Sequence, residues 1–230
     1  MNSHYTYFLI LAASLAGPLA LSFDKKVAFY KKWKFLFLPL VIPGLLYIAW
    51  DVYFTSKGVW SFNPAYITGI KLYNLPLEEV LFFFIVPYCC IFIYDCVRAY
   101  FPALKEKKIA DRILQLLAIA LLVTGILFCK KYYTGWAFIL TGIFISCIYL
   151  FRNFFRGFDA ASFCIAYLII LIPFLIVNGF LTAIPVVLYN DAENLGTRIY
   201  TIPFEDVFYN MLLVLMNISI YEMVKRTSKS

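Results

Sequence analysis

Two pairs of neighbouring carboxylates are the residues of this chain whose types and spacing could best do chemistry. Each pair follows a proline and opens a run of apolar side chains, in the motifs Pro76-Leu77-Glu78-Glu79 and Pro203-Phe204-Glu205-Asp206. A structural explanation is available, because proline suits the first turn of a helix and carboxylates there complement the positive end of the helix dipole by about 0.3–1 kcal/mol. A catalytic explanation has to be weighed against this one.

Three features of the two motifs favour a catalytic role. The pairs occur twice at one register, apolar residues follow at once, and no basic residue stands nearby on the same segment. A carboxylate close to hydrocarbon is costly unless it is used. A carboxyl group that is desolvated beside a second carboxyl keeps its proton more readily near neutral pH. We therefore predict that one of these acids is a general acid; the predicted catalytic residues are Glu78, Glu79, Glu205 and Asp206.

Aromatic side chains lie about one helical turn beyond the acids. Four residues separate Glu78 from Phe82, and the same spacing recurs from Glu205 to Tyr209, so acid and ring share a helix face. Aromatic faces stabilise a nearby cation where water would quench it. An acid beside an aromatic cage predicts carbocation chemistry on an apolar substrate. The residues predicted to shield the cation are Phe82, Phe83, Phe84, Phe208 and Tyr209.

The elements that must position these residues are membrane-spanning helices. The chain is 63% hydrophobic and only 14% charged, which is more apolar surface than one soluble core can bury. A spanning helix needs roughly 20 mostly apolar residues. We predict an all-α polytopic membrane protein with seven spans. They run approximately over Tyr5–Phe23, Phe35–Phe54, Pro76–Val97, Ile113–Phe128, Trp136–Leu150, Ser162–Ile184 and Phe204–Val224.

The formal charge of +7 reflects membrane topology and implies no nucleic-acid partner. Most of the 20 Lys and Arg fall on one predicted side, including Lys105, Lys107 and Lys229. By the positive-inside rule, we expect the N-terminus outside and the C-terminus in the cytoplasm of a cell membrane. Two acids at the cytoplasmic end are expected to pair with Arg98 or Lys225; these are Asp95 and Glu222.

An internal repeat relates the two acidic motifs at an offset of 127 residues. The same offset, without gaps, pairs Asn63 with Asn190, Gly69 with Gly196, Tyr73 with Tyr200 and Tyr94 with Tyr221. After three spans the chain is on the opposite side of the membrane from where it began. A second copy with the same orientation therefore needs one additional crossing. We therefore predict a first three-helix repeat over residues 1–100, a linker helix over 101–131 and a second three-helix repeat over 132–230.

Other polar residues could support the acids. Asp51 either joins the acidic cluster or is an ordinary interfacial aspartate, and its repeat partner is Asn178. Four further residues could orient the acids by hydrogen bonds, although Tyr is common at membrane interfaces anyway; these are Tyr73, Tyr200, Asn63 and Asn190.

No cofactor or metal is expected. The one histidine, His4, lies near the N-terminus, and the six cysteines lack metal-site spacing. The ten glycines form no G-x-G, so the fingerprint of a flavin or nicotinamide site is missing.

The repeated pattern of a proline and paired acids opening an aromatic helix, with Asn, Gly and Tyr upstream, resembles the lycopene cyclase domain family. The resemblance covers most of the chain, which looks like the fused form of two small three-helix subunits. It implies a cofactor-free isomerase that cyclises the linear ends of lycopene or a related carotenoid within the lipid bilayer. The expected product carries β rings, although the sequence does not fix β, γ or ε type. Contact with other carotenoid enzymes is left open.

The resemblance also implies how the acids act. One carboxylic acid, with Glu78 favoured, protonates the terminal double bond; the neighbouring double bond closes a six-membered ring; and a carboxylate removes a proton. The second motif departs from the first, since Asp206 replaces the second Glu and Asn210 stands where the first copy has Phe83. The two halves need not be equivalent.

Two other classes of seven-span protein share features with this chain. Parallel three-helix repeats are also the plan of small sugar transporters, but few polar residues lie at mid-membrane here. Retinal-binding pumps need a lysine within the last helix, and Phe204–Val224 contains none. The transporter is the alternative that topology alone does not exclude.

Overall fold

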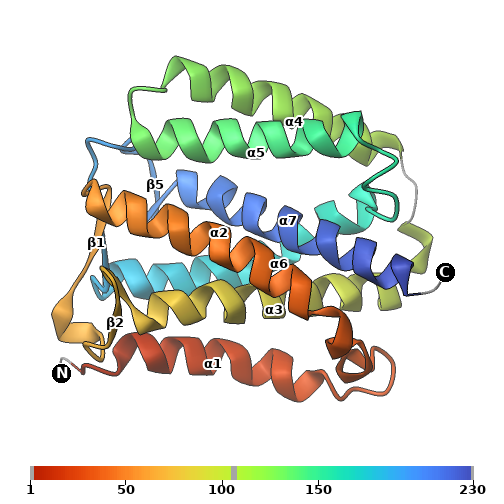
Figure 1. Cartoon of the computed structure of the whole chain (residues 1–230), viewed down its shortest axis with the longest axis horizontal. Coiled ribbons are helices and arrows are strands. Elements are labelled where there is room, and N and C mark those ends of the chain that lie inside the picture. The colour runs from red at the N-terminus through yellow and green to blue at the C-terminus, as the bar shows by residue number, and fades with distance from the viewer. Residues whose placement is uncertain (1–2, 105–107, 229–230) are drawn as a thin grey trace.

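The fold is a bundle of long helices, described by a computed structural model over residues 3–104 and 108–228 (Figure 1). The α-helices within these ranges are α1 Thr6–Leu21, α2 Phe37–Ser56, α3 Leu77–Tyr100, α4 Lys108–Leu127, α5 Tyr132–Leu150, α6 Ala160–Ala183 and α7 Glu205–Thr227. Short 3₁₀ segments are η1 Phe29–Phe35, η2 Pro64–Tyr66 and η3 Pro102–Leu104. The strands are β1 Trp60–Phe62, β2 Lys71–Leu72, β3 Leu75–Pro76, β4 Val187–Tyr189, β5 Arg198–Ile199 and β6 Ile202–Pro203.

Six of the helices, α2 to α7, are long and apolar enough to cross a membrane. The all-α polytopic fold predicted from composition is therefore confirmed. Helix α1 has 16 residues, and so a seventh span stays a prediction, although α1 runs along the bundle beside α3 (Figure 1). Helices α4 and α5 begin earlier than the segments predicted at Ile113 and Trp136, and reach 20 and 19 residues.

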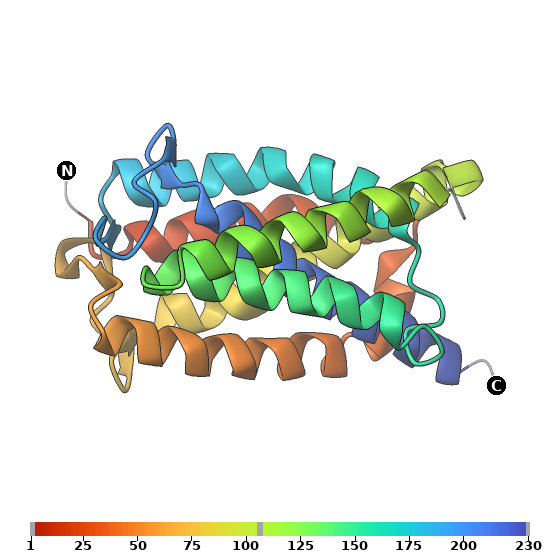
Figure 2. The ribbon, with the colours of Figure 1, turned by 90° about the horizontal axis from the view of Figure 1, so that it is seen from above.

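The helices differ in how deeply they lie in the bundle. Helix α7 packs against α5, α2 and α3, and 61% of its apolar stretch is buried. Helix α4 packs mainly on α5, at one edge of the bundle, and only 28% of its apolar stretch is buried (Figures 1 and 2). The remaining apolar surface of α4 suits contact with lipid.

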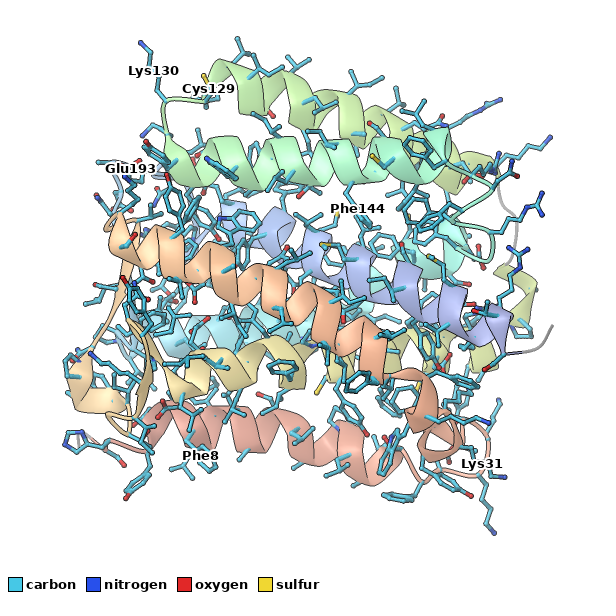
Figure 3. All side chains as sticks on the ribbon, viewed as in Figure 1. Phe8, Lys31, Cys129, Lys130, Phe144 and Glu193 are labelled. Carbon is cyan, nitrogen blue, oxygen red and sulfur yellow. The ribbon has the colours of Figure 1, made fainter. Side chains whose placement is uncertain are left out.

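The two ends of the bundle differ in charge and in structure. All the strands lie at the end where α1 begins, together with Lys130 and Glu193, whereas Lys31 lies at the opposite end (Figure 3). At that opposite end, buried Asp95 pairs with Lys32 at 2.9 Å and with Lys225 at 3.5 Å. Arg98 lies 2.5 Å from Glu222, so the predicted ion pairs are confirmed. Three basic residues used in the topology prediction, Lys105, Lys107 and Lys229, lie outside the described residues.

A small hairpin precedes both α3 and α7 and repeats the same contacts at the 127-residue offset. Strand β2 pairs with β3, Lys71 facing Pro76, and β5 pairs with β6 in the equivalent register. The turn residues Tyr73 and Tyr200 both have left-handed backbones, with φ of 59° and 60°. The repeat seen in the sequence thus corresponds to a repeated local structure at the start of each acidic helix.

The loops of the two halves also pair with each other. Strands β1 and β4 are antiparallel, with Ser61 opposite Leu188, the residue 127 positions later. The flanking bonds are reciprocal, because Asn63 N donates to Val186 O and Asn190 N donates to Val59 O, both at 2.9 Å. The pairing therefore has local two-fold symmetry. The partition into residues 1–100, 101–131 and 132–230 stays a prediction.

Candidate active site

A narrow cavity of about 40 Å³ lies near the strand end of the bundle, below the paired loops. Carboxylates from α2, α3 and α7 line it, each near the helix end that meets the loops. Its wall consists of Tyr7, Asp51, Trp60, Phe62, Glu79, Phe82, Tyr133, Phe174, Asn178, Leu181, Thr182, Val187, Tyr189, Asp206, Tyr209, Asn210 and Leu213. The second acid of each motif is therefore the one that faces this space.

Glu79 reaches the cavity from the first turn of α3. The buried Tyr7, on α1, donates its hydroxyl hydrogen to Glu79 Oε2 at 2.6 Å. This hydrogen bond holds one oxygen of the carboxyl group in place beside the cavity. This geometry suits a carboxylic acid that gives its proton to a group in the cavity.

Asp206, in the equivalent place on α7, is more completely surrounded by donors. Tyr133 donates to Oδ1, while Tyr189 donates to Oδ2 at 2.9 Å and Asn178 approaches Oδ2 at 3.4 Å. Burial, followed by the charge of Asp206, raises the pKa of Tyr189, which lies outside the spanning helices and stays a neutral donor. Several donors stabilise the ionised form of a carboxyl group. Asp206 is thus suited to accept a proton.

Asp51 is the third carboxyl group on the cavity. It is 1% exposed and accepts a hydrogen bond from the indole of Trp60, on β1. Its repeat partner, Asn178, lines the same cavity. Of the two interpretations left open for Asp51, the structure favours membership of the acidic cluster.

The first acids of the motifs point elsewhere. Glu78 Oε1 accepts the backbone N–H of Thr68 at 2.7 Å, and Glu205 Oε1 accepts that of Leu195 at 2.7 Å, 127 positions later. Thr134 also donates to Glu205 at 2.6 Å. Both acids are buried, and neither belongs to the cavity wall. The geometry gives them the role of anchoring each hairpin loop to its helix.

Replacing Glu205 by Ala is expected to destabilise the protein by about 2–3 kcal/mol, because a backbone donor and a threonine hydroxyl lose a buried acceptor. Thermal unfolding of purified protein in detergent measures this loss. Glu205→Gln keeps an oxygen acceptor and is the matched control. An unchanged unfolding temperature for Glu205→Ala would contradict the anchoring role.

The predicted aromatic cage is only partly assembled at the cavity. Phe82 and Tyr209 line it, and they occupy equivalent positions on α3 and α7. Phe83 is buried against Tyr47, with ring centroids 5.6 Å apart. Phe208 packs against Phe138, and Phe84 packs on Gly44. Phe83, Phe84 and Phe208 therefore lie outside the cavity wall.

The predicted orienting residues lie in the loops rather than at the acids. Tyr73 and Tyr200 are 82% and 83% exposed at the hairpin tips. Asn63 and Asn190 accept backbone N–H bonds two residues ahead, at 3.0 and 3.1 Å, and so shape the turns. None of the four lines the cavity. The structure does not bring them to the acids.

Three tyrosines that contact the cavity acids were not predicted from the sequence. Tyr7, Tyr133 and Tyr189 come from α1, α5 and β4, at least 17 positions from the acid that each contacts. Nothing in their local sequence distinguishes them from interfacial tyrosines. The offset of 127 residues between Asp51 and Asn178 was the available signal for that pair.

The fold and the site together define a polytopic helical membrane protein with paired acids and aromatic rings around a narrow cavity. A family model described as lycopene cyclase matches residues 4–97 and 130–224, and the chain belongs to the lycopene cyclase family. This result confirms the resemblance carried by the two motifs. The stretch between the two matched ranges contains all of α4, the predicted linker.

The chain is also similar to fungal proteins named bifunctional lycopene cyclase/phytoene synthase. It is 30% identical to that of Aspergillus oryzae over 94 residues, 40% of this chain and 15% of the relative. It is 36% identical to that of Phaeosphaeria nodorum over 85 residues, 37% of this chain and 13% of the relative. The match to that of Pyrenophora tritici-repentis is 45% over 47 residues, 20% of this chain and 8% of the relative. No solved structure matches the chain.

Proposed function

We propose that this protein is a lycopene cyclase that converts the linear end groups of lycopene into β rings without net redox change. Family membership and the names of the fungal relatives support this function. The observation that carries it is the placement of Glu79 and Asp206, equivalent residues of two motifs, on one largely apolar cavity. The reaction is an isomerisation, since one proton is added and one is removed.

The first step is proton transfer from Glu79. Its carboxyl group gives a proton to the terminal C=C of lycopene, which leaves a tertiary carbocation at the neighbouring carbon. The next C=C along the chain attacks this carbon, a C–C bond closes the six-membered ring, and the positive charge moves to a ring carbon. Tyr7 fixes the second oxygen of Glu79 during the transfer.

The second step is loss of a proton from the ring carbocation to Asp206. The three donors on Asp206 stabilise its carboxylate and hold it beside the cavity. The electrons of the broken C–H bond form the ring double bond. Loss of the proton on the ring carbon that carries the polyene chain gives the β ring. The position of Asp206 therefore sets the ring type. Proton exchange between the two acids, through the cavity, restores the starting state.

The rings on the cavity protect the cation. Phe82 and Tyr209 present aromatic surface, and attraction between a cation and a desolvated ring amounts to about 2 kcal/mol. The cavity of about 40 Å³ has room for only a few water molecules. The end group therefore enters by displacing side chains of the wall, and little water remains to capture the cation.

The protein acts from within a cell membrane. The acids lie at the strand end of the bundle, and the positive-inside rule places that end outside and the C-terminus in the cytoplasm. Lycopene is the partner that the apolar surroundings suit. A sugar transporter, the alternative from topology, receives no support from the family match.

Expression of the chain in bacteria that accumulate lycopene is expected to convert the pigment to cyclic carotenes. Chromatography of the extracted pigments, with absorption spectra to identify the ring type, measures the outcome. A strain that expresses the double variant Glu79→Gln/Asp206→Asn is the control. Unchanged lycopene in cells whose membranes contain the wild-type protein would overturn the proposal.

A further inference from the structure

Two apolar grooves lie on the bundle at equivalent places in the two repeats. The first groove, about 150 Å³, is formed by α1, α3 and α6, and the second, about 350 Å³, by α2, α5 and α7. The offset of 127 residues relates their walls, pairing Cys89 with Met216, Pro173 with Leu46, Phe174 with Tyr47 and Val177 with Trp50.

Of the two grooves, only the first adjoins the acidic cavity. Phe82, Phe174 and Asn178 line both spaces. The second groove shares no wall residue with the cavity in the part of the chain that the structure describes. The two repeats are therefore alike in plan but differ in whether their groove adjoins the acidic cavity.

Three aromatic rings, packed in tilted and edge-to-face contacts, lie between the second groove and the cavity. The ring of Trp50 lies 5.3 Å from that of Tyr47 and 4.9 Å from that of Tyr209, the residue that lines the cavity. Tyr47 also donates to the backbone oxygen of Tyr209 at 2.8 Å, which holds these rings together. In the first groove the residue equivalent to Trp50 is the much smaller Val177. One side chain therefore accounts for much of the difference between the grooves.

The first groove opens between helices whose outer faces are apolar. Leu9 and Phe8 on α1 are 58% and 46% exposed, and Phe8 projects away from the bundle (Figure 3). On α6, Ile172 and Ile176 are 63% and 56% exposed. The groove extends past Ser14 and Cys89 toward the middle of the bundle. Its surroundings suit an apolar chain that approaches from the lipid.

We propose that the first groove holds the polyene chain of lycopene and guides one end group from the bilayer to Glu79 and Asp206, whereas the second groove carries no substrate. This inference rests on the proposed cyclase function. One open groove admits one end group at a time, so a second ring forms only after the carotenoid leaves and returns with its other end. The monocyclic carotene is then a released intermediate.

Matched tryptophan substitutions test the assignment of the two grooves. Cys89→Trp fills the first groove and is expected to lower the ratio of cyclic product to lycopene by at least about 10-fold. Met216→Trp, at the equivalent place in the second groove, is expected to stay within about twofold of wild type. Val177→Trp gives the first groove the residue that closes the second, and provides an independent second variant.

Binding is measured separately from turnover by placing each substitution in the Glu79→Gln background. Lycopene that co-purifies with the protein, read from its absorption per mole of protein, should fall with Cys89→Trp and Val177→Trp but not with Met216→Trp. Equal losses from Met216→Trp, or full retention in both first-groove variants, would overturn the groove assignment. Failure of the cyclase function shows itself differently, as an absence of cyclic product from wild-type protein that still binds lycopene.

Discussion

Replacing Glu79 by Gln is expected to lower cyclisation of lycopene by at least about 100-fold, because a glutamine amide is not an acid that can protonate the substrate. General acid catalysis typically contributes a factor of this size or more. The substitution keeps the size of the side chain and an oxygen that accepts from Tyr7. The measurement is the rate of cyclic carotene formation in isolated membranes supplied with lycopene, normalised to the amount of protein.

Glu78→Gln is the matched control, one position away on the same helix. Its oxygen Oε1 accepts the Thr68 N–H at 2.7 Å, a bond that a glutamine oxygen can also accept. Activity within about 10-fold of wild type is expected, since the group does not touch the cavity. An inactive Glu78→Gln beside an active Glu79→Gln would instead make Glu78 the proton donor, as the sequence alone had favoured.

The helices could be predicted because hydropathy over about 20 residues is a strong signal. The starts of α4 and α5 were placed too late, since Lys108 and Tyr132 lie in polar or aromatic stretches that hydropathy excludes. The paired strands β1 and β4 join residues about 130 positions apart and are three residues long. Elements of that length have no usable periodicity, so their pairing depends on contacts that only the folded bundle supplies.

The acidic site could be predicted as a pair of motifs but not as particular side chains. Neighbouring residues on a helix point about 100° apart, so one member of each pair must face away from any shared cavity. Which member does so depends on the direction from which the helix meets its loop. In the two motifs, the backbone N–H of Thr68 or of Leu195 donates to the first acid, and the second acid faces the cavity.

The predicted aromatic residues meet at the cavity only in part, for a related reason. Phe82, Phe83 and Phe84 follow each other on α3 and so point in three directions. Only Phe82 faces the cavity, whereas Phe83 fills the space against α2. Rings brought by other elements, such as Tyr133 and Trp60, complete the wall. A cage assembled from several helices leaves no compact pattern in the sequence.

Replacing Asp206 by Asn is also expected to lower cyclisation by at least about 100-fold, because the ring cation then lacks a carboxylate to take its proton. The asparagine amide would also place a donor against one of the two phenols that bond to Asp206. The measurement is again the rate of cyclic carotene formation per amount of protein. Asp206→Glu restores a carboxylate of the kind found at Glu79, and recovery to within about 10-fold of wild type is expected.

Tyrosine variants separate the role of the carboxylate from that of its donors. Tyr133→Phe and Tyr189→Phe each remove one hydrogen bond to Asp206, and a loss of about 10-fold is expected from each. The remaining donors still stabilise part of the charge, so neither variant should reach the loss caused by Asp206→Asn. Wild-type activity in both variants would show that the phenols only shape the cavity.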